Sequence, residues 1–264
     1  MSEILNNTAN TPLSILVVDD DELNQRMMRL LLKRDGHSVE CVSNGQEALS
    51  AVKTQSYDMI LMDLQMPVMD GVEASRCIRE WEKGGRHIFI VALTASYLPE
   101  RGRELFEAGI DNYMPKPFDV DHLRNILQYG IENRKLRNVS ELEQPKAAEI
   151  SDDQEFDAQM GIKRVGGDIE TYKELLQDFV NELSDKLENI KSCYGNTDKD
   201  GLYRAAHNLK GVAANLGALQ LSEHARRLEK QVSESYTESI DSLINDLSVS
   251  VVKLKENAYN FLAG

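Results

Sequence analysis

Short apolar runs rich in β-branched residues alternate with longer stretches of helical spacing throughout the first half of the chain. The runs that we interpret as strands are 15–18, 38–42, 59–62, 88–93 and 110–114. The stretches that we interpret as helices are 22–34, 46–53, 71–83, 99–108 and a last one that starts at Asp119. Strand–helix alternation with nearly continuous apolar strands predicts a parallel sheet that is covered on both faces. We therefore expect an α/β domain over residues 13–133, a doubly wound (βα)5 sheet of the flavodoxin-like kind.

The pattern changes after Asn133. Residues 134–154 are polar and acidic, and we interpret them as a linker. Residues 155–264 contain no proline, and their apolar residues recur at helical spacing over 169–193, 201–216, 219–232 and 240–262. Four helices of this length predict a second, all-α domain, an antiparallel four-helix bundle.

Composition excludes several classes of protein. Forty-four acidic residues against thirty basic ones give a formal charge of −14, which disfavours binding to nucleic acid or to anionic membranes. No apolar run approaches the ~20 residues of a membrane span, and the polar first residues do not resemble a signal peptide. Three widely separated cysteines have neither disulfide nor metal-ligand spacing. We expect a cytoplasmic protein.

Polar residues whose side chains could bind a ligand or take part in a reaction follow four of the predicted strands. They are Asp19-Asp20-Asp21 after the first strand, Asp63 after the third, Thr94 after the fourth and Lys116 just beyond the fifth. The carboxyl ends of parallel strands form a ligand crevice, so these groups are expected to converge. Clustered carboxylates raise one another's pKa unless a cation neutralises them, and Mg²⁺ prefers oxygen ligands. A lysine charge and a threonine hydroxyl would stabilise a phosphoryl group that arrives at a carboxylate oxygen.

The segments around these residues resemble the response-regulator receiver domain. They are 15–20, 62–71, 92–95 and 116–118, in the order of that family. The resemblance implies that Asp63 is the phosphoacceptor, that Lys116 binds the phosphoryl group, and that the Lys116–Pro117 bond is cis. It also implies a Mg²⁺ site and a pair of switch residues. The metal ligands would be Asp19, Asp20, Asp63 and the carbonyl of Gln65, and the switch residues would be Thr94 and Tyr113. Taken singly, such residues have plainer interpretations, and we expect Asp21 and Asp70 to cap helices.

His207 lies in the third long helical stretch of the chain. At ~100° per residue it shares a face with Lys210 and Gly211, while Leu209 and Val212 lie on the opposite, core-facing side. This arithmetic predicts that His207 is exposed on the bundle surface, although a lone exposed histidine is usually solvated surface.

The segment 206–217 resembles the H-x-x-K-G signature of histidine-containing phosphotransfer (Hpt) domains, whose fold is a four-helix bundle. The resemblance implies that His207 is the phosphorylated nucleophile. It implies that Lys210 supports the phosphohistidine electrostatically and that Gly211 provides clearance for a partner.

A receiver joined to an Hpt domain implies a phosphorelay protein. A sensor histidine kinase would load Asp63, and His207, in the same or another copy, would exchange the phosphoryl group with a downstream receiver's aspartate.

The first helical stretch is apolar on two sides, and the resemblance favours Leu23, Met27 and Leu30 as a partner-facing stripe; a fully buried helix is the alternative. No glycine-rich nucleotide loop is found, so we expect no kinase activity from these two domains. The donor would act in trans, or the chain would be the tail of a hybrid kinase; the polar start favours a free-standing protein.

Two other functions are consistent with parts of the sequence. Asp19-Asp20-Asp21-Glu22-Leu23 imitates the first half of the D-x-D-x-[TV] motif of metal-dependent aspartyl-phosphate hydrolases, but Leu23 stands where Thr or Val is needed. A binding scaffold with one or both sites silent is the third possibility. The sequence leaves open the donor, the acceptor, the signal, the direction of transfer, the phosphoryl lifetime and the oligomeric state.

Overall fold

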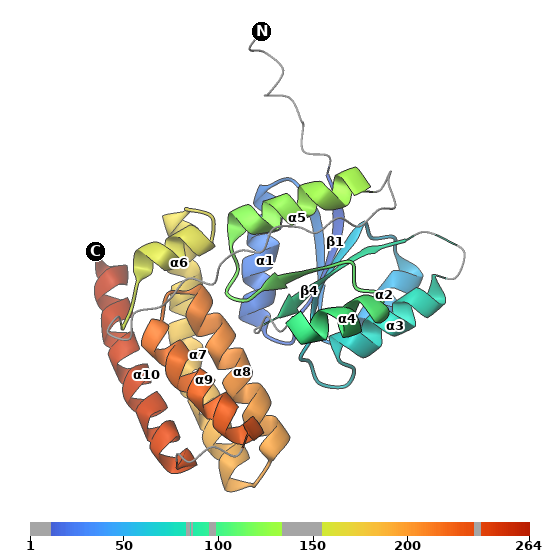
Figure 1. Ribbon diagram of the computed structural model, residues 1–264. Coiled ribbons are helices and arrows are strands. Elements are labelled where there is room, and N and C mark those ends of the chain that lie inside the picture. The colour runs from blue at the N-terminus through green and yellow to red at the C-terminus, as the bar shows by residue number, and fades with distance from the viewer. Residues whose placement is uncertain (1–11, 83–84, 86, 95–98, 134–154, 235–238) are drawn as a thin grey trace. The chain divides into compact units, whose positions relative to one another are not determined.

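The computed structural model describes residues 12–82, 85, 87–94, 99–133, 155–234 and 239–264 (Figure 1). The predicted linker at 134–154 lies outside the described residues. The chain separates into two compact units, and each is described by itself.

The first unit contains one parallel sheet, as predicted. Its strands are β1 (Ser14–Val18), β2 (Ser38–Val42), β3 (Met59–Asp63), β4 (Phe89–Thr94) and β5 (Asn112–Pro115), and they lie in the order β2-β1-β3-β4-β5. The helices that connect and follow them are α1 (Glu22–Arg34), α2 (Gly45–Thr54), α3 (Gly71–Trp81), α4 (Pro99–Glu107) and α5 (Val120–Asn133). The predicted (βα)5 fold is confirmed, with strand and helix ends shifted by at most two residues.

Alternate residues of the central strands point to opposite faces, and both faces are apolar. Leu16, Ile60 and Ile90 belong to a buried cluster that includes residues of α2, α3 and α4. On the other face, α5 approaches the sheet so closely that a Cβ on Gly130 would lie 2.6 Å from the Met59 side chain. Figure 1 shows α1 and α5 on one side of the sheet and α2, α3 and α4 on the other. Two buried faces explain the continuous apolar strands, because both sides of each strand lose contact with water.

Asp21 and Asp70 cap helices, as expected. The Asp21 side chain accepts hydrogen bonds from the backbone N–H groups of Leu23 and Asn24 at the start of α1. Asp70 accepts from the N–H of Glu73 at the start of α3. Each carboxylate satisfies donors that the first turn of a helix leaves without intrahelical partners. The caps fix where α1 and α3 begin, directly after the loops that follow β1 and β3.

The second unit is helical. Its four long helices are α7 (Ile169–Gly195), α8 (Lys199–Asn215), α9 (Leu219–Glu234) and α10 (Ile240–Ala263). Their buried stripes, such as Leu176, Phe179 and Leu183 on α7, follow the helical spacing of the sequence. The predicted four-helix bundle is confirmed.

A short helix, α6 (Ala158–Arg164), precedes the bundle and was not predicted. Seven residues with two glycines nearby are too few to give a readable apolar period. The helix is instead set by contacts distant in sequence, because the Asp157 N–H donates to the carbonyl of Gly217 at 2.8 Å.

Candidate functional site

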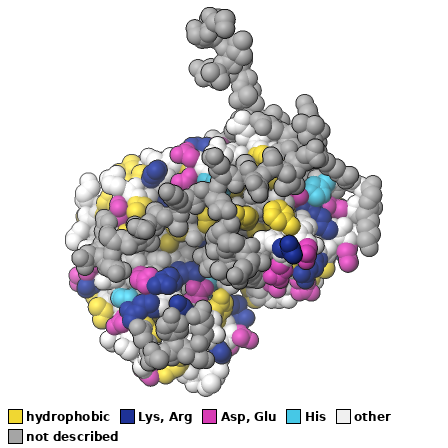
Figure 2. Space-filling view, viewed as in Figure 1, with side chains coloured by type: hydrophobic (Ala, Val, Ile, Leu, Met, Phe, Trp, Pro, Cys, Tyr) yellow, Lys and Arg dark blue, Asp and Glu magenta, His cyan; other side chains and the backbone are white. Residues whose placement is uncertain are grey.

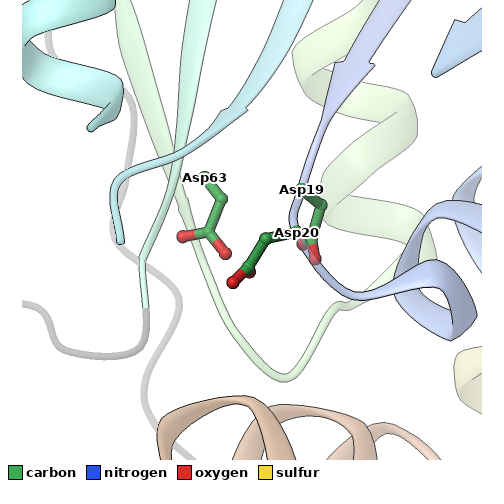
Figure 3. A group of neighbouring side chains, drawn as sticks. All are labelled: Asp19, Asp20 and Asp63. Atoms are coloured by element: carbon green, nitrogen blue, oxygen red, sulfur yellow. The ribbon is translucent and has the colours of Figure 1, made fainter. Parts of the chain in front are cut away.

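Three carboxylates converge at the carboxyl edge of the sheet. Asp19 and Asp20 directly follow β1, and Asp63 is the last residue of β3, the strand next to β1. A carboxylate oxygen from each lies within 4.8 Å of one from each of the others. Figure 3 shows the three carboxylates pointing toward a common space. The predicted convergence of these aspartates is therefore observed.

Hydrogen bonds hold two of these carboxylates in place. Asp19 Oδ1 accepts from the N–H of Asp21 at 3.0 Å and from the side-chain amide of Asn24 at 3.2 Å. Asp63 Oδ1 accepts from the N–H of Gln65 at 3.0 Å. Asp19 and Asp63 are 1% and 2% exposed, so both negative charges are almost completely removed from bulk water. Such burial of adjacent charges is unfavourable unless a cation joins them.

The carboxylates fit a magnesium ion. Their clustered oxygens match the preference of Mg²⁺ for hard oxygen ligands, and Mg²⁺ commonly takes only a few of its ligands from the protein. Gln65 follows Asp63 by two residues and is tied to it by its N–H bond to Asp63 Oδ1, and its carbonyl remains a predicted ligand.

The other predicted residues of this site occupy neighbouring strand ends. Thr94 is the last residue of β4, and Tyr113 lies in β5, where it is paired with Ala92. Lys116 directly follows β5, is 9% exposed and carries its ammonium 6.0 Å from the centre of the Phe118 ring. The Lys116–Pro117 bond is cis, as the resemblance implied. Thr94 and Tyr113 are half-buried.

His207 lies in α8, but the prediction that it is exposed is wrong. The residue is 4% exposed. Within the bundle, Glu229 of α9 lies against its Nδ1 atom at 2.5 Å, and the ring of Tyr203 stacks on it at 6.3 Å between centroids. The rotation of a helix tells which residues share a face, but not what an adjoining helix places over that face. Among the described residues, Glu229 is the only hydrogen-bond partner of the imidazole, and it contacts Nδ1 and not Nε2.

Glu229 is a neighbour of His207 and Lys210 that the sequence did not reveal. Its second carboxylate oxygen accepts from the Lys210 ammonium at 2.5 Å, so one carboxylate joins the histidine and the lysine of the H-x-x-K-G segment. A carboxylate at Nδ1 favours the tautomer whose proton is on Nδ1 and whose lone pair is on Nε2. The available signal was only an acidic residue in an otherwise amphipathic helix, 22 residues from His207.

The electrostatics of Glu229 follow from these contacts. Burial raises the pKa of its carboxyl, but the hydrogen bond from His207 and the charge of Lys210 act in the opposite direction and leave the pKa below its ordinary value. Glu229 is therefore held as a carboxylate beside the imidazole.

Gly211 is one turn beyond His207. It is buried, yet a Cβ at this position would have no neighbouring atom within 4 Å. The open space next to the histidine agrees with the clearance that the Hpt resemblance implied.

The predicted partner-facing stripe of α1 is largely covered. Leu23 and Met27 are 5% and 3% exposed, and Leu30 is half-buried. The expectation that one stripe is left uncovered is not met, and the role of these residues in docking remains a prediction.

Acidic and basic side chains lie interspersed on the face of the molecule drawn in Figure 2. The excess of acidic residues is thus not gathered into one patch on that face. Within the described part of the chain, no helix combines the length and apolar character needed to cross a membrane.

The chain thus combines a doubly wound sheet that has an acidic cluster at its carboxyl edge with a helical bundle that has a histidine–carboxylate pair. Family models match residues 15–128 to the response regulator receiver domain and residues 174–251 to the Hpt domain. The chain therefore carries a receiver domain followed by an Hpt domain, the composition of a two-component phosphorelay protein.

Several known proteins are similar to this chain. The sensor protein GacS of Pseudomonas syringae pv. syringae is 30% identical over 247 residues, which are 92% of this chain and 27% of GacS. The sensory/regulatory protein RpfC of Xanthomonas campestris pv. campestris is 29% identical over 225 residues, which are 81% of this chain and 30% of RpfC. The solved receiver domain of a sensor histidine kinase from Pseudomonas aeruginosa, which holds a magnesium ion in its active-site cleft, is 38% identical. That match covers 46% of this chain and 98% of the solved chain, with a TM-score of 0.42. The chain spans less than a third of the length of the curated relatives GacS and RpfC.

Proposed function

We propose that this chain is a phosphotransfer intermediate in which Asp63 accepts a phosphoryl group and His207 exchanges it with a receiver aspartate. The observation that supports this most is the convergence of Asp19, Asp20 and Asp63 at the carboxyl edge of the sheet. Three buried or half-buried carboxylates at one point oppose folding unless they serve a cation and a charged reactant.

Asp19, Asp20, Asp63 and the Gln65 carbonyl would hold Mg²⁺. When bound, the ion would neutralise negative charge on the oxygens of a phosphoryl group that approaches Asp63. Lys116 would supply a further positive charge, and the Thr94 hydroxyl would donate to a phosphoryl oxygen, with Tyr113 following this movement as the second switch residue. The protein's own contribution is to fix the Asp63 carboxylate, which the Gln65 N–H orients at 3.0 Å.

Transfer from Asp63 to a histidine is a displacement at phosphorus. The Nε2 lone pair attacks, the P–N bond forms as the bond between phosphorus and the Asp63 oxygen breaks, and that electron pair returns to the carboxylate. The imidazole keeps its Nδ1 proton and gains positive charge. Glu229, 2.5 Å from Nδ1, would stabilise that charge and hold the ring in the reactive tautomer.

Lys210 would support the phosphohistidine as a point charge, and its bond to Glu229 fixes its position. Gly211 would let a receiver approach the ring, because no atom lies within 4 Å of its missing Cβ.

A sensor histidine kinase would supply the phosphoryl group, and the aspartate of a downstream receiver would take it from His207. The GacS protein of Pseudomonas protegens, 29% identical over 250 residues, is named a sensor histidine kinase, which supports a kinase partner for this pair of domains. We place the receiver at 13–133, the linker at 134–154 and the Hpt domain at 155–264, and we assign ATP-dependent kinase activity to neither domain.

The proposal is tested by loading the full chain from acetyl phosphate with Mg²⁺ and measuring its intact mass. The unmodified chain and the His207→Gln variant should each gain a phosphoryl group. The Asp63→Asn variant should gain none. Addition of EDTA should abolish loading, because the metal neutralises the three carboxylates.

The same experiment separates the competing functions. No added mass on the unmodified chain would support a silent scaffold. Steady hydrolysis of a small phosphate ester that survives Asp63→Asn would support a hydrolase that uses Asp19 as its nucleophile.

A further inference from the structure

Val68 adopts a strained backbone conformation in the loop that leaves the phosphoacceptor strand. Its φ is 71°, and the Met69 N–H donates to the carbonyl of Pro67 at 2.8 Å. This is a γ-turn of the rare, left-handed form, in which a β-branched side chain is unfavourable. Among the described residues, Thr197 is the only other residue besides glycine with a positive φ.

Folding gives no compensation for this strain. The Val68 side chain is 83% exposed, so it buries almost no apolar surface within the chain. Glycine would adopt the same φ without strain and would place no apolar group in water. Strain that brings no gain in stability is typical of residues whose side chain serves function.

The loop is anchored on both sides of Val68, which fixes the direction of its side chain. The Gly71 N–H donates to the carbonyl of Leu64 at 3.3 Å, and the Met69 carbonyl accepts from the N–H of Gly45 at 3.1 Å. A Cβ on Gly71 would lie only 2.2 Å from the carbonyl oxygen of Asp63. The two ends of the loop therefore meet at the phosphoacceptor, and Val68 projects from its tip.

We infer that Val68 is an apolar contact for the four-helix bundle that exchanges the phosphoryl group with Asp63. Any bundle that brings an imidazole to Asp63 must approach this loop, because the loop begins at Asp63 and returns to it. A bundle of the present kind also has room near the histidine, since a Cβ on Gly211, one turn away, would meet no atom within 4 Å. The inference rests on the proposed function and names a specificity-determining residue for it.

The test uses two full-length variants of this chain. The donor carries His207→Gln and is loaded on Asp63 with acetyl phosphate and Mg²⁺, then freed of the reagent. The acceptor carries Asp63→Asn, and its phosphoryl gain is followed by intact mass. Donors with Val68→Gly and Val68→Ala should transfer about 10-fold more slowly, the effect of losing a central apolar contact. Loading by acetyl phosphate should stay within about twofold, because a small donor makes no such contact.

Two controls separate contact from backbone strain. Val68→Gly should also raise the unfolding temperature of the receiver, followed by the fluorescence of Trp81, by roughly 2–4 °C. A donor with Thr197→Gly relieves the other strained position, in the turn after α7, and should transfer at the unmodified rate.

The outcomes are distinct. Failure of acetyl phosphate to load the His207→Gln donor would overturn the proposed function itself. Normal loading with no transfer from the donor that keeps Val68 would overturn the choice of partner. Equal transfer from Val68, Val68→Gly and Val68→Ala donors, or a loss of loading in step with transfer, would overturn the role of Val68 as a contact.

Discussion

Glu229 contacts both His207 and Lys210. Its two oxygens contact His207 Nδ1 and Lys210 Nζ, each at 2.5 Å, so the carboxylate orients the ring and the lysine together. A charge in a nearly buried position interacts more strongly with its partner than a charge in water does. Removal of the partner is also more destabilising there, because the remaining charge is buried without compensation. The hydrogen bond from His207 and the charge of Lys210 keep the buried carboxylate ionised.

We predict that Glu229→Gln slows phosphoryl transfer to His207, measured with a loaded receiver donor, and that Glu229→Ala slows it further, by about 10-fold or more. Glutamine keeps an oxygen that can accept from Nδ1 but loses the negative charge, and alanine loses both. Loading of Asp63 by acetyl phosphate is the internal control and should not change. Equal transfer rates in all three chains would show that the contact is only structural.

The same substitution has an expected pH signature. The folded-state pKa of Glu229 lies below its ordinary value of 4.5, so its ionic contacts stabilise the fold above pH 4.5. That contribution is lost as the pH falls through the lower, folded-state pKa. The unfolding midpoints of the unmodified chain and Glu229→Gln should therefore differ most above pH 4.5 and converge in more acidic solution. A difference that grows on acidification would contradict this assignment.

At the scale of helices and strands, the close approach at Gly217 connects α8 to the start of α6. Gly217 has φ of 76°, and a Cβ there would lie 2.0 Å from the carbonyl oxygen of Asp157. Gly167 has nearly the same φ, 83°, but its Cβ would meet nothing within 4 Å. The two glycines have nearly the same backbone conformation, and they differ in whether other atoms lie where a Cβ would be placed.

We predict that Gly167→Ala destabilises the bundle by roughly 1–2 kcal/mol, the conformational penalty alone. Gly217→Ala should cost about 3 kcal/mol or more, because the backbone of Asp157 must also shift. Urea unfolding followed by far-UV circular dichroism measures both. The fluorescence of Trp81, the single tryptophan and a residue of α3, should report an unchanged receiver transition. Equal losses for the two variants would contradict the crowding argument.

Periodicity predicted most of the elements, because burial on one or two faces leaves a direct trace in the order of residues. The strands β1, β3 and β4 were readable as continuous apolar runs since both of their faces are covered. The carboxylate cluster was predictable for a related reason, as parallel strands bring their ends to one edge. Contacts between helices were not, because the rotation of α8 does not reveal that Glu229 of α9 lies over His207. The short helix α6 was missed since its cap depends on Gly217, which is distant in sequence.

At the scale of the whole molecule, the net charge bears on how two copies meet. Each chain carries a formal charge of −14, so two copies that exchange a phosphoryl group repel one another before contact. Such repulsion is long-ranged at low salt, where the Debye length is about 30 Å at 0.01 M, and short-ranged at about 8 Å at 0.15 M.

We predict that transfer between separate copies becomes several-fold faster as the ionic strength rises from about 0.01 to 0.15 M. A His207→Gln donor loaded on Asp63 and an Asp63→Asn acceptor give this rate directly, at concentrations where the rate is proportional to the acceptor. Under acceptor saturation the encounter no longer limits the rate, and the salt dependence should disappear. A rate that falls with salt would mean that opposite charges at the contact surface outweigh the net charge of the two chains. Phosphoryl gain by the acceptor that is independent of donor concentration would exclude transfer between copies.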